Sequence, residues 1–269
     1  MIADLHNHTT ASDGQYEPLE LIRKAQQSGT KLFAITDHDT INGSKYAFEH
    51  QNEFDLKLIS GIEFGAKEAS HLHILGYNFD INSPVMQNAC EVLQKSRDER
   101  KYRIIKYLKD RGVEISLKEV EAVAGSELIA RPHFALVMVK KGYVKSVQEA
   151  FEKHLDVPEF QKIERFKYSA SEIIDIIHAS GGKAVLAHPM QLKLSYEVLD
   201  KFVENLVSLG LDGMECYYAT HTHEETDTLL KMAEKYGLFT TAGSDFHGEK
   251  IKGPQKFINI EIDESTLLK

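Results

Sequence analysis

Side chains of the kind that bind metal ions follow nearly every short apolar run of this chain, and this dispersal constrains its fold more than any other feature. The runs that we predict to be strands cover residues 2–5, 32–36, 57–61, 71–76, 184–187, 212–216 and 238–242. Most of them are continuously apolar, as expected of strands that are covered on both faces. The chain must therefore fold so that the ends of distant strands meet at one rim, where their histidines and carboxylates can form a multinuclear metal site.

Predicted helices alternate with several of these strands. They cover residues 18–28, 171–180, 199–209 and 226–236, and a glycine, which favours helix termination, follows each of them. This repeat predicts a parallel sheet or barrel whose functional residues collect at the C-terminal ends of the strands. Between residues 83 and 166 only further helices are expected, at 84–112, 117–124, 132–141 and 147–154. We therefore predict an α/β barrel domain from residues 1–82 and 167–269, with a helical insertion subdomain at 83–166.

The composition excludes several classes of protein. A chain of 269 residues that is 42% hydrophobic can bury a large core, and its net charge of −9 argues against binding of duplex DNA. No apolar run approaches the ~18 residues of a membrane span, and no signal peptide pattern is present, so we expect a soluble cytoplasmic protein. The two cysteines, Cys90 and Cys216, exclude a disulfide framework.

The candidate metal ligands indicate a metal site because they occur together in one chain. His6 and His8 lie two residues apart, so on a strand both imidazoles point to the same side and can bind one ion. Glu63 follows an apolar run, and one carboxylate there can bridge two cations. Taken singly, a His-x-His pair is as typical of a surface strand as of a metal site. An aspartate in a polar turn, such as Asp13, is more typical of an ordinary turn than of a metal site. The full candidate set is His6, His8, Asp13, His38, Glu63, His73, His188, Asp245 and His247.

Six motifs in this order resemble the polymerase-and-histidinol-phosphatase (PHP) family. They are DLHNHTTASDG, ITDHDT, GIE, HLHILGY, AHP and GSDFHG. The resemblance covers nearly the whole chain apart from the predicted insertion. It implies a distorted seven-stranded (β/α)7 TIM-like barrel with a dinuclear or trinuclear metal site, which agrees with the seven predicted strands.

The resemblance also implies how the ligands are grouped. The first ion would be held by His6, His8, Glu63 and Asp245, the second by Glu63, His73 and His188, and the third by Asp13, His38 and His247. Histidinol phosphatases commonly have a histidine where this chain has Asp13. The three groups imply two or three divalent ions. A carboxylate oxygen is a harder ligand than an imidazole nitrogen, so we expect Mn²⁺ to be favoured, with Zn²⁺ or iron as alternatives.

The segment Arg131-Pro132-His133 in the insertion resembles the branch of the family that removes the 3′-phosphate from nucleoside 3′,5′-bisphosphates, some members of which trim short RNAs from the 5′ end. Arg131 would donate a bidentate pair of hydrogen bonds to a phosphate, with His133 as a second donor. The alternative is an ordinary loop arginine beside a histidine that caps a helix.

We therefore favour an enzyme, a metal-dependent phosphoesterase (a hydrolase) acting on small nucleotides through in-line attack by a metal-bridging hydroxide. Its expected partners are a nucleoside 3′,5′-bisphosphate and short RNA 5′ ends, with no membrane and no duplex DNA. One alternative is histidinol phosphatase, against which Asp13 and the segment around Arg131 argue. Another is a noncatalytic metal-binding PHP module, against which the unbroken ligand set argues. The sequence assigns neither a general acid nor an oligomeric state.

Overall fold

The chain divides into two units, which the computed structural model describes for residues 1–124 and 129–267. The first unit contains residues 1–91 and 167–269, and the second contains residues 92–166. The division falls inside one long helix, α3 (Pro84–Asp110). Residues 84–91 of this helix belong to the first unit, and residues 92–110 belong to the second. The predicted domain boundary at residue 83 therefore stays a prediction.

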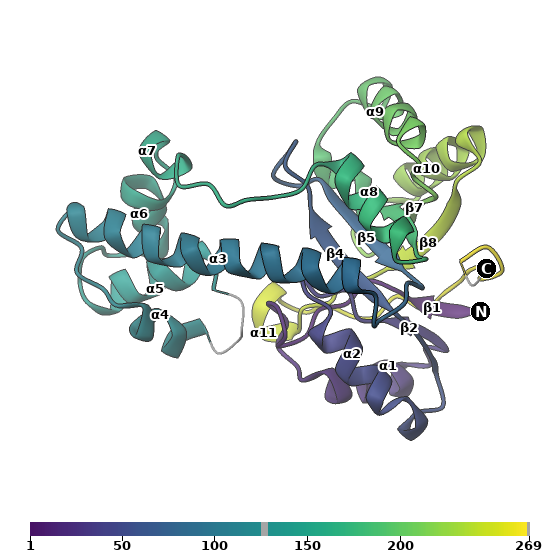
Figure 1. Cartoon of the computed structure of the whole chain (residues 1–269), viewed down its shortest axis with the longest axis horizontal. Helices are drawn as coiled ribbons and strands as arrows, with labels where there is room; N and C mark the ends of the chain where they lie inside the picture. The colour runs from purple at the N-terminus through teal and green to yellow at the C-terminus, as the bar shows by residue number, and fades with distance from the viewer. Residues whose placement is uncertain (125–128, 268–269) are drawn as a thin grey trace. The chain divides into compact units, whose positions relative to one another are not determined.

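The first unit is built on two mixed sheets (Figure 1). One has the strand order β3-β2-β1-β9 and the other the order β4-β5-β6-β7-β8. All seven predicted strands are found, and the run predicted at 57–61 is divided between two strands. The bounds are β1 Ile2–Asp4, β2 Leu32–Ala34, β3 Lys57–Ile59, β4 Gly61–Gly65, β5 His73–Tyr77, β6 Lys183–Leu186, β7 Gly213–Tyr218, β8 Phe239–Gly243 and β9 Ile260–Glu261.

The prediction of a purely parallel arrangement is wrong for one central strand. β5 runs antiparallel to both β4 and β6, with Gly65 opposite His73 and Ile74 opposite Leu186. The connection from β4 to β5 spans only residues 66–72, which is too short for the crossover helix that parallel strands need. This reversal places His73, the first residue of β5, beside the C-terminal end of β6.

The described strands do not close into the predicted barrel by continuous ladders. Isolated bridges, Asn7 to Phe246 and His38 to Glu63, join the two sheets instead. A side chain adds to the backbone hydrogen bonds at the seam between β1 and β8. The backbone N–H of Leu5 donates to the backbone oxygen of Ala242 at 2.8 Å, and Asp4 Oδ1 accepts from the backbone N–H of Ser244 at 3.0 Å. The fold shown is thus α/β with two mixed sheets.

Helices cover the sheets of the first unit. α8 packs against β5 and β6, and α10 packs against β7 and β8 (Figure 1). Helix termination follows the expected chemistry, since Gly29 and Gly237 end α1 and α10 with positive φ angles of 98° and 67°. The bounds are α1 Pro18–Ser28, α2 Asn42–Glu49, the 3₁₀ turn Gln51–Glu53, α8 Ala170–Ala179, the 3₁₀ turn Pro189–Leu192, α9 Tyr196–Ser208, α10 His223–Tyr236 and α11 Glu249–Lys252.

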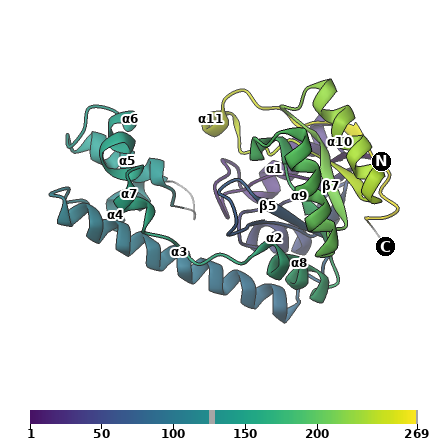
Figure 2. The same cartoon turned by 90° about the horizontal axis from the view of Figure 1, so that it is seen from above.

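The second unit is helical in its described part. Short helices gather along one side of α3 around buried apolar residues that include Ile104, Leu108 and Phe134 (Figure 2). The helix predicted at 147–154 is an α-helical turn followed by a π-helical one. The bounds are α4 Leu117–Ala124, α5 Arg131–Lys140, α6 Val147–Ala150, the π-helical turn Phe151–Leu155 and α7 Pro158–Gln161. No helix in the described parts of the chain is long and apolar enough to cross a membrane.

Candidate metal centre

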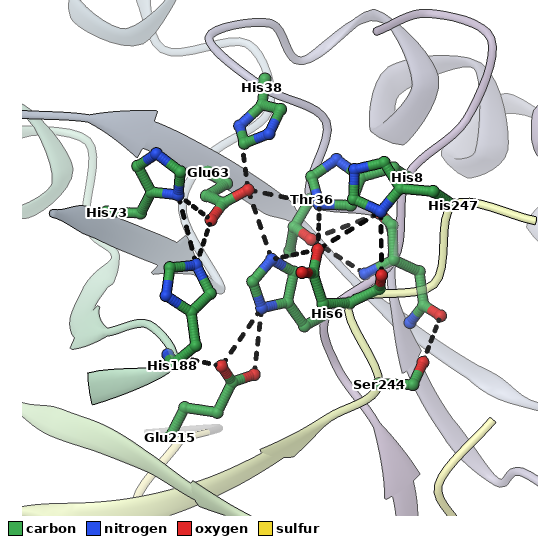
Figure 3. A network of polar contacts seen from close by, with 12 residues as sticks. His6, His8, Thr36, His38, Glu63, His73, His188, Glu215, Ser244 and His247 are labelled. Carbon is green, nitrogen blue, oxygen red and sulfur yellow. Dashed lines mark hydrogen bonds and ion pairs between the residues drawn. The ribbon is translucent and has the colours of Figure 1, made fainter. Parts of the chain in front are cut away.

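All nine predicted ligands meet in the first unit, around Glu63, and Figure 3 labels all of them except Asp13 and Asp245. Glu63 lies in the middle of β4 and is fully buried. The others follow the ends of strands, except His73, which reaches the same rim because β5 is antiparallel. They are His6 and His8 after β1, Asp13 in the next turn, His38 after β2, His73 at the start of β5, His188 after β6, and Asp245 and His247 after β8.

The first predicted set converges on one point. His8 Nε2 lies 3.2 Å from both Glu63 Oε2 and Asp245 Oδ1. His6 Nε2 lies 3.3 Å and 3.6 Å from the same two oxygens. His6, His8, Glu63 and Asp245 therefore form one group that could hold a metal ion, with the membership expected from the sequence.

The second predicted set uses the other oxygen of Glu63. Oε1 lies 2.7 Å from His73 Nδ1 and 3.1 Å from His188 Nε2, and these two nitrogens are 3.2 Å apart. His38 also approaches, because its Nδ1 is 2.9 Å from Glu63 Oε2. The two oxygens of one buried carboxylate thus face two different groups of imidazoles.

The third predicted set lies on the more exposed side of the centre and includes one more residue than expected. His247 Nε2 is 3.3 Å from Asp13 Oδ1, and His38 Nε2 is 3.8 Å from Asp13 Oδ2. His8 Nδ1 comes within 3.6 Å of Asp13 Oδ1, so His8 can contribute to two groups through its two ring nitrogens. This double role was not apparent from the motif.

The donor atoms fit metal ions on two counts. Ligands with metal bonds of about 2.1 Å are about 3.0 Å apart around an octahedral ion and about 3.4 Å apart around a tetrahedral one, close to most of the distances above. In addition, several buried polar atoms find no hydrogen-bond partner among the described residues, a costly state without a ligand. They include His6 Nε2, both ring nitrogens of His8, and Glu63 Oε2.

The electrostatics of the cluster also favour cations. Burial works against ionisation of the three carboxylates, yet neighbouring histidines hold the pKa of Asp13, Glu63 and Asp245 well below the usual range. Burial also opposes protonation of His8, but Asp245 and Glu63 raise its pKa to about 9. Three ionised carboxylates in a buried site need positive charge beside them, which protons on histidine or bound metal ions can supply.

The backbone at two ligands is held in an uncommon conformation. His188 has a φ of 27° and Asp245 a φ of 52°, both in the region that residues with a side chain rarely adopt. Such conformations cost about 1–3 kcal/mol and cluster at functional sites, where the surrounding structure enforces them.

Comparison with known proteins identifies the family. A family model described as the PHP domain matches residues 4–208. The chain belongs to the PHP domain family. The family predicted from the six motifs is therefore confirmed.

Two relatives and one solved structure are similar to this chain over most of its length. The chain is 34% identical over 253 residues to the 5′-3′ exoribonuclease Rnm of Escherichia coli, covering 92% of this chain and 85% of the relative. It is 27% identical over 246 residues to the 3′,5′-nucleoside bisphosphate phosphatase of Chromobacterium violaceum, covering 91% and 86%. A solved structure of an amidohydrolase from Chromobacterium violaceum has a TM-score of 0.78 at 26% identity, covering 95% of this chain and 91% of that one.

Two residues that support the PHP ligands were not assigned this role from the sequence. Glu215 on β7 is fully buried, with Oε1 3.0 Å from His6 Nδ1 and Oε2 accepting from the backbone N–H of His188 at 2.8 Å. Tyr218 donates from its hydroxyl to Asp245 Oδ2 at 2.8 Å. Both follow the apolar start of β7, so the signal was their position at a strand end, as for the ligands themselves.

The two predicted substrate-binding residues lie in the second unit. Arg131 is the first residue of α5, and its Nη1 lies 3.4 Å from Asp156 Oδ1. His133 Nδ1 accepts a hydrogen bond from the backbone N–H of Ala130 at 3.0 Å, so this histidine caps the helix, as the alternative interpretation expected. A substrate contact of either residue stays a prediction.

Proposed function

We propose that this PHP-family protein is a metal-dependent phosphoesterase that removes the 3′-phosphate from nucleoside 3′,5′-bisphosphates. The observation that carries the proposal is the position of Glu63, whose two oxygens face different groups of imidazoles. A carboxylate placed in this way can bridge two cations, and paired cations are typical of enzymes that hydrolyse phosphate esters. The two relatives are, by name, a phosphatase and an exoribonuclease, so both names denote this chemistry.

The ligand groups favour two or three divalent ions, with Mn²⁺ preferred. The first ion would be held by His6, His8, Glu63 and Asp245, the second by Glu63, His73 and His188, and the third by Asp13, His38 and His247, with the other ring nitrogen of His8 close to the third. Oxygen ligands favour harder ions, and Asp13 adds a carboxylate to the third group, where histidine would favour Zn²⁺.

The protein's own residues would position these ions and hold the site together. Divalent ions in such sites lower the pKa of a bound water and neutralise the charge of phosphoryl oxygens. Glu215 and Tyr218 orient His6 and Asp245 through the contacts described above. Neither cysteine is suited to act as a nucleophile, because both are buried and burial raises the pKa of the Cys90 thiol to about 12 and that of Cys216 further still.

The two candidate substrate classes share one chemical unit. In a nucleoside 3′,5′-bisphosphate, and at the end of a 5′-phosphorylated RNA, the first nucleoside has a phosphate at O5′ and a phosphate ester at O3′. Hydrolysis of the bond between phosphorus and O3′ releases a nucleoside 5′-monophosphate in both cases. One centre can therefore act on both, and we include short RNA 5′ ends among the proposed substrates.

We also infer that the two sheets form the distorted barrel of the PHP family. Alternate residues of strands from both sheets, including Ala3, Leu32, Leu75 and Val185, pack into one buried cluster. Tyr77 donates across this interior to the backbone oxygen of Leu5 at 2.9 Å. A shared interior of this kind supports a barrel whose seams are bridged at single points, and it would place the ligands on one rim.

The experiment that tests the function uses adenosine 3′,5′-bisphosphate before and after metal removal. We expect AMP and inorganic phosphate as products, loss of turnover after chelation, and recovery with Mn²⁺. A 5′-phosphorylated oligoribonucleotide should yield nucleoside 5′-monophosphates from its 5′ end under the same conditions. Adenosine 3′-phosphate as the product, or turnover that survives complete metal removal, would contradict the proposal.

A further inference from the structure

Asp37 is a buried carboxylate that lies beside the metal centre without being one of the nine ligands. It follows β2 and directly precedes the ligand His38, and the residue is 1% exposed. A carboxylate in such a place is costly unless hydrogen-bond donors satisfy its oxygens. The donors that satisfy Asp37 therefore identify the part of the chain that depends on it.

Three hydrogen bonds join Asp37 to one turn, residues 9–14, which carries the ligand Asp13. The backbone N–H of Thr9 donates to Asp37 Oδ1 at 2.8 Å, and the Thr9 hydroxyl donates to Oδ2 at 2.6 Å. The hydroxyl of Ser12 donates to Oδ1 at 2.5 Å. Such distances are typical of charge-assisted hydrogen bonds, which are about twice as strong as neutral ones. Asp37 thus anchors the turn at two residues that precede Asp13.

Inside this turn, Thr9 is the residue to which the others are bound. Its backbone oxygen accepts from the backbone N–H of Ser12 at 3.0 Å and from that of Gly14 at 2.8 Å. Its hydroxyl oxygen accepts from the backbone N–H of Ala11 at 3.2 Å. Because Asp37 holds Thr9 through both its N–H and its hydroxyl, the carboxylate fixes the position of the whole turn and of the ligand that the turn carries.

The hydroxyl of Ser12 lies between two carboxylates and has one proton to donate. Its oxygen is 2.5 Å from Asp37 Oδ1 and 3.3 Å from Asp13 Oδ1, so the proton goes to Asp37. Asp13 Oδ1 instead faces His247 Nε2 at 3.3 Å and His8 Nδ1 at 3.6 Å. Asp37 therefore leaves the Asp13 oxygen with lone pairs that are available for a metal ion.

Gly43 provides the space that the side chain of Asp37 occupies. It lies in the first turn of α2, and its φ angle is not positive, so the backbone conformation does not require glycine there. Within a helix, alanine is more favourable than glycine by about 1 kcal/mol. A Cβ at Gly43, however, would collide with Asp37 Oδ2 and would lie 2.7 Å from Thr9 Oγ1. The close packing of α2 against Asp37 and Thr9 therefore requires the glycine.

The backbone around Asp37 is held independently of its side chain. The backbone N–H of Glu63 donates to the backbone oxygen of Asp37 at 3.2 Å, and that of Asp39 donates to the backbone oxygen of Glu63 at 2.9 Å. The backbone N–H of His8 donates to the backbone oxygen of Phe246 at 2.9 Å. Loss of the Asp37 carboxylate should therefore displace the turn while leaving the ligands Glu63 and His8 in place.

We infer that Asp37 is a positioning residue that sets the affinity of the third group of ligands for its metal ion. Its carboxylate holds the turn so that Asp13 reaches the three histidines of that group. They are His8, His38 and His247. The inference rests on the proposed function for the arrangement of three ions, but metal binding can be measured without turnover.

The test measures Mn²⁺ binding to the full-length protein by equilibrium dialysis, with the metal content of the chain determined by mass spectrometry. Asp13→Asn should weaken the binding of one ion, which identifies the third group. Asp37→Ala should weaken the same ion by about tenfold to a hundredfold, the usual effect of residues that orient metal ligands, and leave the other ions bound. In the Asp13→Asn background, Asp37→Ala should cause no further loss, because a residue that acts through Asp13 has nothing left to position.

Two further variants separate positioning from general stability. Asp37→Asn retains an oxygen that can accept from Thr9 and Ser12, so it should recover most of the affinity that Asp37→Ala loses. Ser12→Ala removes one of the three hydrogen bonds and should weaken the same ion, which keeps the test decisive if Asp37→Ala does not fold.

Asp212→Ala is the matched control. Asp212 also holds the backbone through its carboxylate, because Oδ2 accepts from the backbone N–H of Ala184 at 2.8 Å and lies 2.7 Å from His178 Nε2. It directly precedes β7 and therefore lies at the end of that strand opposite to the ligands. This variant should keep all bound ions even if it lowers the free energy of unfolding.

Wild-type Mn²⁺ binding by Asp37→Ala overturns the inference, as does wild-type binding by Ser12→Ala if Asp37→Ala does not fold. Loss of every ion from Asp37→Ala, a further loss in the double variant, or an equal loss with Asp212→Ala overturns it as well. Failure of the proposed function alone would instead appear as the predicted pattern of Mn²⁺ binding in a protein that does not hydrolyse adenosine 3′,5′-bisphosphate.

Discussion

Replacement of Glu215 by glutamine should weaken metal binding although Glu215 is not expected to touch a metal ion. Its carboxylate lies 3.0 Å from His6 Nδ1 and accepts from the backbone N–H of His188 at 2.8 Å. The first contact favours the tautomer of His6 whose Nε2 lone pair faces the metal group, and the second fixes the backbone of another ligand. Carboxylates that orient ligands in this way are worth about 10- to 100-fold in metal affinity. Because Glu215 supports two ligands, we expect a loss of about 30- to 100-fold, or roughly 2–2.7 kcal/mol.

The assay for this prediction is phosphate release from adenosine 3′,5′-bisphosphate as a function of free Mn²⁺. The Mn²⁺ concentration at half-maximal activity should rise about 30- to 100-fold for Glu215→Gln, while most of kcat returns at saturating Mn²⁺. Glu224→Gln, an exposed change in the first turn of α10, should match the wild type. An unchanged Mn²⁺ requirement, or a loss of kcat that Mn²⁺ does not restore, would refute the assigned role of Glu215.

Three further predictions concern the same centre. Glu63→Ala should lose bound metal and turnover together, because two ligand groups share this carboxylate; metal content near wild type by mass spectrometry would contradict the bridging role. Gly243→Ala should lower the free energy of unfolding by about 1–3 kcal/mol, because the added Cβ would collide with Glu215 Oε1 and His6 Cβ. An unchanged midpoint of urea unfolding would show that these neighbouring atoms move aside at little cost. Asp13→His should raise activity with Zn²⁺ relative to Mn²⁺, and an unaltered ratio of the two activities would show that Asp13 does not set metal preference.

Much of the fold and of the ligand set follows from the sequence because both depend on local signals. Continuous apolar runs marked the strands, and glycines such as Gly29 and Gly237 marked the ends of helices. A polar residue directly after a buried strand, such as His188, cannot be explained by packing and therefore indicated the site. These signals predicted which side chains meet, although the distances between them depend on strands far apart in the sequence.

The features that the sequence did not predict depend on relations between distant segments. The direction of β5 is not encoded in its apolar pattern, although the short connection at residues 66–72 was a usable signal. The role of Glu215 depends on His6, which lies 209 residues away in the chain. The division inside α3 could not be located because neither glycine nor proline interrupts the sequence between Val85 and Asp110.

The most direct test of the account compares two substrates with one preparation of Mn²⁺-loaded protein. We predict that adenosine 3′,5′-bisphosphate is hydrolysed to AMP with a kcat/KM above ~10⁴ M⁻¹ s⁻¹, within the ordinary range of enzymes, and that histidinol phosphate is a much poorer substrate. A preference for histidinol phosphate would contradict the proposed specificity. Absence of turnover with both substrates, at full metal occupancy, would contradict the assignment as a phosphoesterase of small phosphate monoesters.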